Sequence, residues 1–195
     1  NLANQEWHSD SSFKKIPSKM SILSAKIIPS LGGNTEFLSM RASYNALPYD
    51  LKLKIDDKVC WHDYSHGRSK IDPNLVTPEE KQALPPVKQK LVLSDNKHGK
   101  SLYLGAHCRN IDGMSENDSN ALLAEINSYI DTEKFIYSHV WEPYDLIMWD
   151  NRVLLHRVIP YNYAKYRRAM IRGTVEGKDP VLGPFSNEVR YGTDN

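Results

Sequence analysis

The 195-residue sequence has little cysteine and no long apolar run. Its two cysteines, Cys60 and Cys108, are too few for a disulfide framework and lack the CxxC spacing of a metal site. We therefore expect reduced thiols and a cytoplasmic location. Apolar runs such as 146–149 are far shorter than the roughly twenty residues of a membrane span, so no membrane segment is predicted.

Net charge is also nearly absent, because 25 basic residues face 24 acidic ones and leave +1. This balance gives no electrostatic reason to expect nucleic acid or an anionic membrane as a partner. The 40% hydrophobic content excludes a disordered chain, and no repeat or linker divides the sequence. We predict a single domain over 1–195.

Short runs rich in β-branched and aromatic residues, bounded by turn residues, predict a mainly β core of the sandwich or barrel type. The predicted strands are 20–28, 35–38, 90–93, 102–105, 135–141, 146–149, 153–155 and 169–175.

Helices are predicted as insertions into this β core. An apolar stripe favours a helix over 116–130, with Ser115 as its N-cap. Thr77, Pro78 and Glu80 are typical of a helix start, and Pro48 should divide 40–55 into two short helices. These signals predict a helix-rich insert at about 40–100.

His8 and Asp10 form a His-x-Asp triplet, which in an extended chain places an imidazole and a carboxylate on one face. Such triplets are common by chance, so a third ligand is required. His156, which follows a strand-like segment, is a candidate. Two histidines and one carboxylate form the open triad that suits Fe(II), because three coordination positions stay free for a bidentate co-substrate and dioxygen.

Arg168 and Arg172 have an even spacing that places both on one face of a strand. That face could grip two carboxylates, one from a dicarboxylate co-substrate and one from the main substrate. The alternative, that both arginines face solvent beside Glu176 and Asp179, is equally compatible with the local pattern.

The other histidines have simpler interpretations. His62 and His66 have the i, i+4 spacing of a zinc pair but lack the glutamate of the HExxH motif. His107 and His139 alternate with apolar residues, which is typical of hydrogen-bonded structural histidines.

Several segments match the motifs of a known enzyme family in both order and spacing, and the match runs from the first residues to about Thr174. They are Asn4-Gln5-x-Trp7-His8-Ser9-Asp10-Ser11-Ser12-Phe13, Gly32-Gly33-Asn34-Thr35-Glu36-Phe37, Met40-Arg41-Ala42-x-Tyr44-x-Ala46-Leu47-Pro48, Leu84-Pro85-Pro86-Val87, Leu104-Gly105-Ala106-His107, Met148-Trp149-Asp150-Asn151-Arg152-x-x-Leu155-His156-Arg157 and Arg167-Arg168-x-Met170. The chain resembles the Fe(II)/2-oxoglutarate-dependent dioxygenases of the taurine dioxygenase superfamily, most closely the 2,4-dichlorophenoxyacetate dioxygenase branch.

The resemblance implies a double-stranded β-helix, or jelly-roll, with iron bound by His8, Asp10 and His156. It implies that Thr35 and Arg168 hold the distal carboxylate of 2-oxoglutarate and that Arg172 faces the acidic group of the primary substrate. Trp149 is interpreted as a core residue.

The implied reaction uses dioxygen and 2-oxoglutarate to hydroxylate a small anionic organic substrate, and it releases succinate and CO2. An aryloxyacetate would be cleaved at its ether bond. Two alternatives stay open: a taurine or alkylsulfonate dioxygenase, and a catalytically silent β-barrel that binds a metal or ligand.

Two departures from the family pattern stand out. Asn34 precedes Thr35 where close relatives often have Asp, and only seven residues precede His8. Because the chain starts without Met, we expect the domain to lack its N-terminal portion. Uncovered strand edges would then favour a homo-oligomer.

Overall fold

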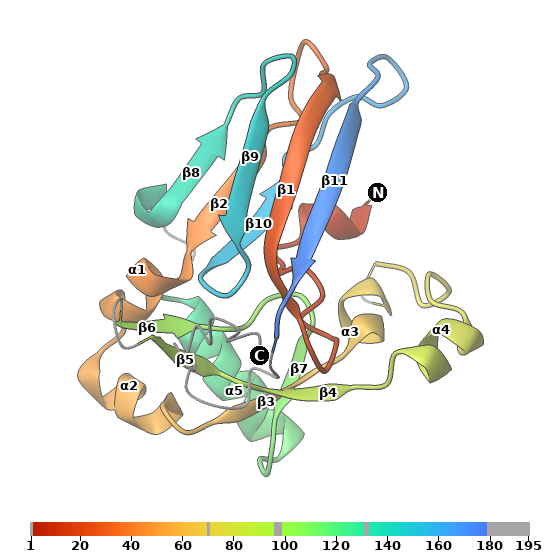
Figure 1. The fold of residues 1–195 in the computed structure, drawn as a ribbon. Coiled ribbons are helices and arrows are strands. Elements are labelled where there is room, and N and C mark those ends of the chain that lie inside the picture. The colour runs from red at the N-terminus through yellow and green to blue at the C-terminus, as the bar shows by residue number, and fades with distance from the viewer. Residues whose placement is uncertain (1, 70, 96–98, 131–132, 179–195) are drawn as a thin grey trace, which may run out of the picture.

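The computed structural model describes residues 2–69, 71–95, 99–130 and 133–178, and these form a mainly β structure with a few helices, as predicted (Figure 1). The strands are β1 (Ser18–Ile27), β2 (Thr35–Ser39), β3 (Val59–His62), β4 (Val87–Lys90), β5 (Val92–Asp95), β6 (Gly99–Leu102), β7 (Cys108–Ile111), β8 (Ile136–His139), β9 (Leu146–Asp150), β10 (Leu154–Val158) and β11 (Ala169–Glu176). The helices are η1 (Leu2–Gln5), α1 (Met40–Ala46), α2 (Tyr49–Ile55), α3 (Tyr64–Ser69), α4 (Pro78–Ala83), α5 (Glu116–Asn127) and η2 (Glu133–Phe135).

Two antiparallel three-stranded sheets face each other in the upper half of Figure 1. One has the order β11-β1-β9 and the other β10-β2-β8. Buried Trp149 of β9 packs edge-on against Phe37 of β2, with ring centroids 5.3 Å apart. Because side chains alternate along a strand, each sheet turns one set inward, and these aromatic rings join the two layers.

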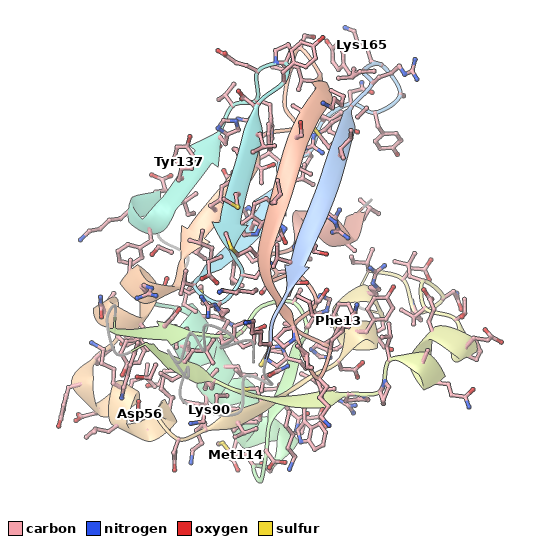
Figure 2. All side chains as sticks on the ribbon, in the orientation of Figure 1. Phe13, Asp56, Lys90, Met114, Tyr137 and Lys165 are labelled. Carbon is pink, nitrogen blue, oxygen red and sulfur yellow. The ribbon has the colours of Figure 1, made fainter. Side chains whose placement is uncertain are left out.

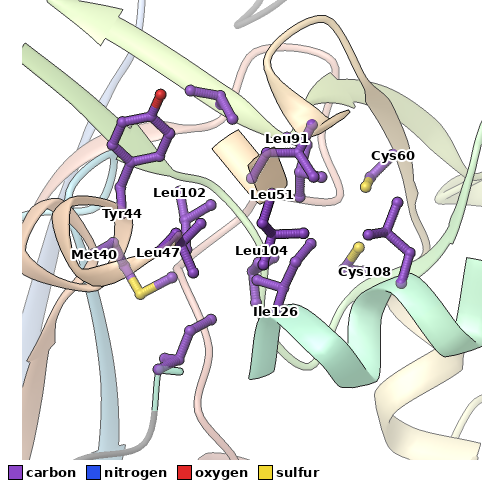
Figure 3. Packing of buried hydrophobic residues seen from close by; sticks show 14 of the residues in the cluster. Met40, Tyr44, Leu47, Leu51, Cys60, Leu91, Leu102, Leu104, Cys108 and Ile126 are labelled. Carbon is purple, nitrogen blue, oxygen red and sulfur yellow. The ribbon is translucent and has the colours of Figure 1, made fainter. Parts of the chain in front are cut away.

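Below these two sheets, a lower layer combines β4-β3-β7 and β5-β6 with helices α1 to α5 (Figure 1). Its apolar core includes Met40, Leu51, Leu102 and Ile126, which converge from helices and strands in Figure 3. Both cysteines lie buried as free thiols in this core. A hydrogen bond with Cys108, together with burial, raises the pKa of the Cys60 thiol, so it stays protonated.

The sequence signals predicted where helices begin more accurately than where they end. Pro48 separates α1 from α2, and Thr77 caps α4 in a capping box with Glu80. Ser115 caps α5, but this helix ends at Asn127 rather than at residue 130. The segment 40–100 carries α1 to α4 together with β3, β4 and β5, and residues 70 and 96–98 of it lie outside the described residues.

Two predicted strands differ from the structure because the backbone turns within them. The run 90–93 is divided, since the Leu91 amide donates to the Lys58 carbonyl and the chain then joins β6 as β5. The run 102–105 ends as a strand at Leu102. Gly105 has φ 141°, and the next amide donates to the Trp7 carbonyl, which turns the chain toward His8.

Among the described residues, no helix combines the length and the apolar character needed to cross a bilayer.

The Gly32-Gly33 loop before β2 packs closely against the backbone that follows β10. A Cβ on Gly32 (φ 74°) would lie 2.6 Å from the backbone oxygen of Pro160, whereas a Cβ on Gly113 (φ 75°) meets nothing within 4 Å. Gly113→Ala therefore introduces only left-handed strain, roughly 1–2 kcal/mol. Gly32→Ala adds a clash with backbone, roughly 1–3 kcal/mol more. Denaturant unfolding of both variants measures the difference, and equal losses would contradict this packing.

Candidate functional site

A short backbone pairing brings the N-terminal segment onto β10. The His8 amide donates to the His156 carbonyl at 3.1 Å, and the His156 amide donates to the His8 carbonyl at 2.9 Å. The two imidazole rings therefore lie side by side, with centroids 4.2 Å apart. Residues separated by almost 150 positions in sequence thus meet through a local β-bridge.

Asp10 completes a compact cluster with these histidines. The Nε2 atoms of His8 and His156 each lie 3.8 Å from Asp10 Oδ1, and all three side chains are buried. One ligand atom from each residue lies within 4.8 Å of the others. A separation of 3.8 Å exceeds a hydrogen bond, so the three atoms converge without bonding each other directly. Two imidazoles and one carboxylate suit a divalent transition metal such as Fe(II).

Both histidine rings are in the neutral state that a metal ligand requires. His8 Nδ1 lies 2.8 Å from the Glu6 carbonyl, which can only accept, so Nδ1 carries the proton and Nε2 offers its lone pair. Burial lowers the pKa of His8 from its ordinary value. Burial, then the neighbouring His8 and Arg172, lowers the pKa of His156 well below its ordinary value. Both rings are neutral at pH 7, the form that binds metals.

Buried polar partners that the sequence did not reveal fix the orientation of Asp10. Ser21 Oγ donates to Asp10 Oδ2 at 2.6 Å, and the Asp10 amide lies 3.4 Å from Asn151 Oδ1. Asn151 Nδ2 donates to Ser21 Oγ at 2.8 Å, and Trp149 Nε1 donates to Asn151 Oδ1 at 3.0 Å. Asn151 stands in a segment that carries the resemblance, which was its only signal, and Ser21 gave none. Outer partners of this kind hold a ligating carboxylate in one orientation.

Thr35 and Arg168 lie together at a second polar site. Arg168 Nε donates to the Gly33 carbonyl at 3.2 Å, and Arg168 Nη2 lies 3.5 Å from Thr35 Oγ1. Thr35 is buried, and burial lowers the pKa of the Arg168 guanidinium while Tyr161 raises it. A partly desolvated cation beside a hydroxyl is a suitable partner for a carboxylate.

Arg172 of β11 points to the cluster of His8, Asp10 and His156. Its Nη1 lies 3.5 Å from Asp10 Oδ1, although 58% of the side chain is exposed. The alternative that Arg172 faces solvent beside Glu176 and Asp179 therefore holds only in part. Asp179 lies outside the described residues.

A cavity of about 100 Å³ beside Asp10 is lined in part by Arg172, Arg68 and His107. The Arg68 guanidinium lies over the Tyr64 ring at 4.3 Å, and within the described residues its buried Nε has no hydrogen-bond partner. Phe13 also lines the cavity and contacts the rings of Tyr64 and His107. In Figure 2 it lies between helix α3 and the lower ends of β1 and β11. Sequence reasoning missed Arg68, which carried no motif.

His62 and His139, among the described residues, stand outside the cluster of His8, Asp10 and His156. His62 is buried and stacks on Tyr103, and burial lowers its pKa to about 4. His139 Nε2 contacts Asp145 Oδ2 at 2.9 Å. Over the described residues, the one group of three possible metal ligands is His8, Asp10 and His156, so the His62 and His66 spacing produces no three-ligand site.

Comparison with known proteins identifies relatives over nearly the whole chain. Residues 1–174 match the family described as Taurine catabolism dioxygenase TauD, TfdA family. The chain is 39% identical over 185 residues to the alpha-ketoglutarate-dependent 2,4-dichlorophenoxyacetate dioxygenase of Burkholderia sp. (strain RASC), covering 94% of this chain and 62% of the relative. It is 39% identical over 175 residues to the enzyme of the same name from Cupriavidus pinatubonensis, covering 89% and 61%. The chain thus spans about three fifths of the length of these relatives.

A solved structure agrees closely with the fold. The crystal structure of AAD-2 in complex with Mn(II) and N-oxalylglycine has a TM-score of 0.87 and 44% identity, covering 94% of this chain and 73% of that one.

Proposed function

The chain belongs to the TauD, TfdA dioxygenase family, and we propose that it carries the Fe(II) and 2-oxoglutarate sites of an enzyme that hydroxylates a small carboxylate substrate. The observation that carries the proposal is the buried convergence of His8, Asp10 and His156.

We propose one domain over 1–195 and a double-stranded β-helix for the two facing sheets. The cytoplasmic location, the homo-oligomer and the lack of nucleic-acid or membrane partners stay predictions.

Iron fits the cluster for reasons visible in the structure. His8 presents Nε2 because its Nδ1 proton is bound by Glu6, and Asp10 is oriented by Ser21. Three protein ligands leave other coordination positions open, as a 2-oxo acid and dioxygen require. When bound, iron supplies the dioxygen chemistry, in which 2-oxoglutarate loses CO2 and becomes succinate. The related AAD-2 crystal structure is a complex with Mn(II) and N-oxalylglycine, a compound with the carboxylate arrangement of the co-substrate, which supports a site for a metal together with a 2-oxo acid.

The protein's own contribution is orientation. Arg168 and Thr35 would bind the distal carboxylate of 2-oxoglutarate, since a guanidinium and a hydroxyl lie 3.5 Å apart there. Arg172 would bind the acidic group of the primary substrate beside the metal cluster, with Arg68 adding positive charge to the same cavity. When both molecules are held in a fixed geometry, their reaction becomes effectively unimolecular instead of depending on a bimolecular encounter.

We propose an aryloxyacetate-type substrate, supported by the names of the relatives. One oxygen atom enters the C–H bond next to the ether oxygen, and the resulting hemiacetal collapses to a phenol and glyoxylate. The second oxygen atom of dioxygen leaves in succinate.

A panel of small acids tests this proposal. The enzyme is incubated with Fe(II), 2-oxoglutarate and one acid at a time, and succinate and phenol are measured. We expect phenoxyacetates to give stoichiometric phenol and succinate, above the level given by taurine. Preference for taurine would contradict the substrate class, and absence of all succinate release would indicate a silent binding protein.

A further inference from the structure

The Thr35 hydroxyl receives hydrogen bonds from two groups that can only donate. Trp141 Nε1 donates to Thr35 Oγ1 at 3.0 Å, and Arg168 Nη2 approaches the same oxygen at 3.5 Å. An indole N–H and a guanidinium have no acceptor atom. A hydroxyl has two lone pairs and one hydrogen, so both lone pairs are occupied and the hydrogen must point elsewhere.

The surroundings leave this hydrogen without a protein acceptor. In the described part of the chain, the Thr35 side chain donates no hydrogen bond. Thr35 is 3% exposed and Trp141 is 5% exposed, so bulk water does not surround the pair. A buried donor without an acceptor costs free energy. An oxygen atom of a bound ligand would satisfy it.

Trp141 itself is held firmly in place. Its ring meets the His139 ring edge-on, with centroids 4.6 Å apart, and His139 is fixed in turn by Asp145 at 2.9 Å. The indole N–H therefore has a defined direction. Trp141 lies two residues beyond the end of β8, the strand that pairs with β2, and the last residue of β8, His139, lies opposite Thr35.

We propose that Trp141 is a positioning residue for the co-substrate: its N–H fixes the Thr35 hydroxyl so that the hydroxyl hydrogen points at the distal carboxylate of 2-oxoglutarate. This inference rests on the proposed function. Sequence reasoning did not single out Trp141, since a tryptophan near a strand end is normally core. Its proposed effect is transmitted entirely through one oxygen atom, Thr35 Oγ1.

In Trp141→Phe, the ring stays but the N–H is lost. One lone pair of Thr35 becomes free, and the hydroxyl can rotate away from the ligand. Loss of one well-placed neutral hydrogen bond weakens binding by about three- to tenfold. The Kd for 2-oxoglutarate should rise by this factor. The affinity for Mn(II) should not change, because the side-chain interactions of Trp141 within the described residues are with Thr35 and His139.

A double-mutant cycle measured by calorimetry on Mn(II)-loaded protein tests the inference. Thr35→Val is expected to weaken 2-oxoglutarate binding by itself, and Trp141→Phe should add no further loss in that background. Trp61→Phe is the matched control, because it also loses an indole hydrogen bond, to Asp112 at 2.9 Å, and Trp61 belongs to the separate β4-β3-β7 sheet. It should leave both affinities unchanged.

Equal affinity of Trp141→Phe and the unsubstituted protein would overturn the inference, as would the same loss in both Thr35 backgrounds or a parallel loss of Mn(II) affinity. If the unsubstituted protein binds Mn(II) but no 2-oxoglutarate, the proposed function fails and this inference fails with it. Binding by the unsubstituted protein with no effect of Trp141→Phe defeats this inference alone.

Discussion

Replacing Asp10 with asparagine is expected to weaken metal binding by at least about 100-fold and to abolish succinate release, since loss of an outer partner alone costs roughly 10–100-fold. The substitution keeps the size of the side chain and its ability to accept from Ser21, at 2.6 Å in the structure. It removes the negative charge on which the two neutral imidazoles of His8 and His156 converge. Mn(II) titration by calorimetry measures the loss.

Asp112→Asn is the control for this experiment. Asp112 accepts hydrogen bonds from Trp61 and Lys88 on the surface of the lower layer, and in the part of the chain that the structure describes it belongs to no three-ligand cluster. It should bind Mn(II) like the unsubstituted protein. Unchanged Mn(II) affinity of Asp10→Asn would show that Asp10 is not a ligand.

Exchanging the two arginines for alanine one at a time should separate the two acid subsites. Arg168 lies beside Thr35, whereas Arg172 lies beside Asp10, so each should serve a different anion. A charge-assisted hydrogen bond contributes about 1.5–3 kcal/mol, which corresponds to roughly 10- to 150-fold in affinity. Arg168→Ala should raise the KM for 2-oxoglutarate by this factor, and Arg172→Ala should raise the KM for the primary substrate.

Each variant is the control for the other. Steady-state succinate release, with one reactant varied and the other saturating, gives both KM values for both proteins. Equal effects of the two substitutions on both reactants would contradict the assignment of separate roles. A larger effect of Arg172→Ala on 2-oxoglutarate would reverse it.

Local patterns predicted much of this fold. The β-branched runs located β1, β2 and β9 within a few residues, and the proline and capping signals located the breaks at Pro48 and Thr77. Strands β3 and β7 were missed, since Val59–His62 and Cys108–Ile111 are short and mix apolar with polar residues. Their pairing depends on partners distant in sequence, which local patterns do not encode.

The residues of the candidate site also differ in whether the local sequence could predict them. His8 and Asp10 were visible as a pair because two residues of extended chain place their side chains on one face. His156 was one candidate for the third ligand, and the resemblance was needed to assign it, because the β-bridge that brings it to His8 joins distant segments. Ser21, Trp141 and Arg68 had no sequence signal. Each acts through a contact with another side chain or a cavity, and such contacts exist only after the sheets have packed.

The central claim is that one site binds Fe(II) and 2-oxoglutarate together, and its most direct test is optical. Fe(II) and 2-oxoglutarate are added to the folded protein without oxygen, and the visible spectrum is recorded. Chelation of Fe(II) by the keto and C1 carboxylate oxygens should give a visible charge-transfer band that Asp10→Asn lacks. Absence of the band from folded protein at saturating concentrations of both would contradict the account.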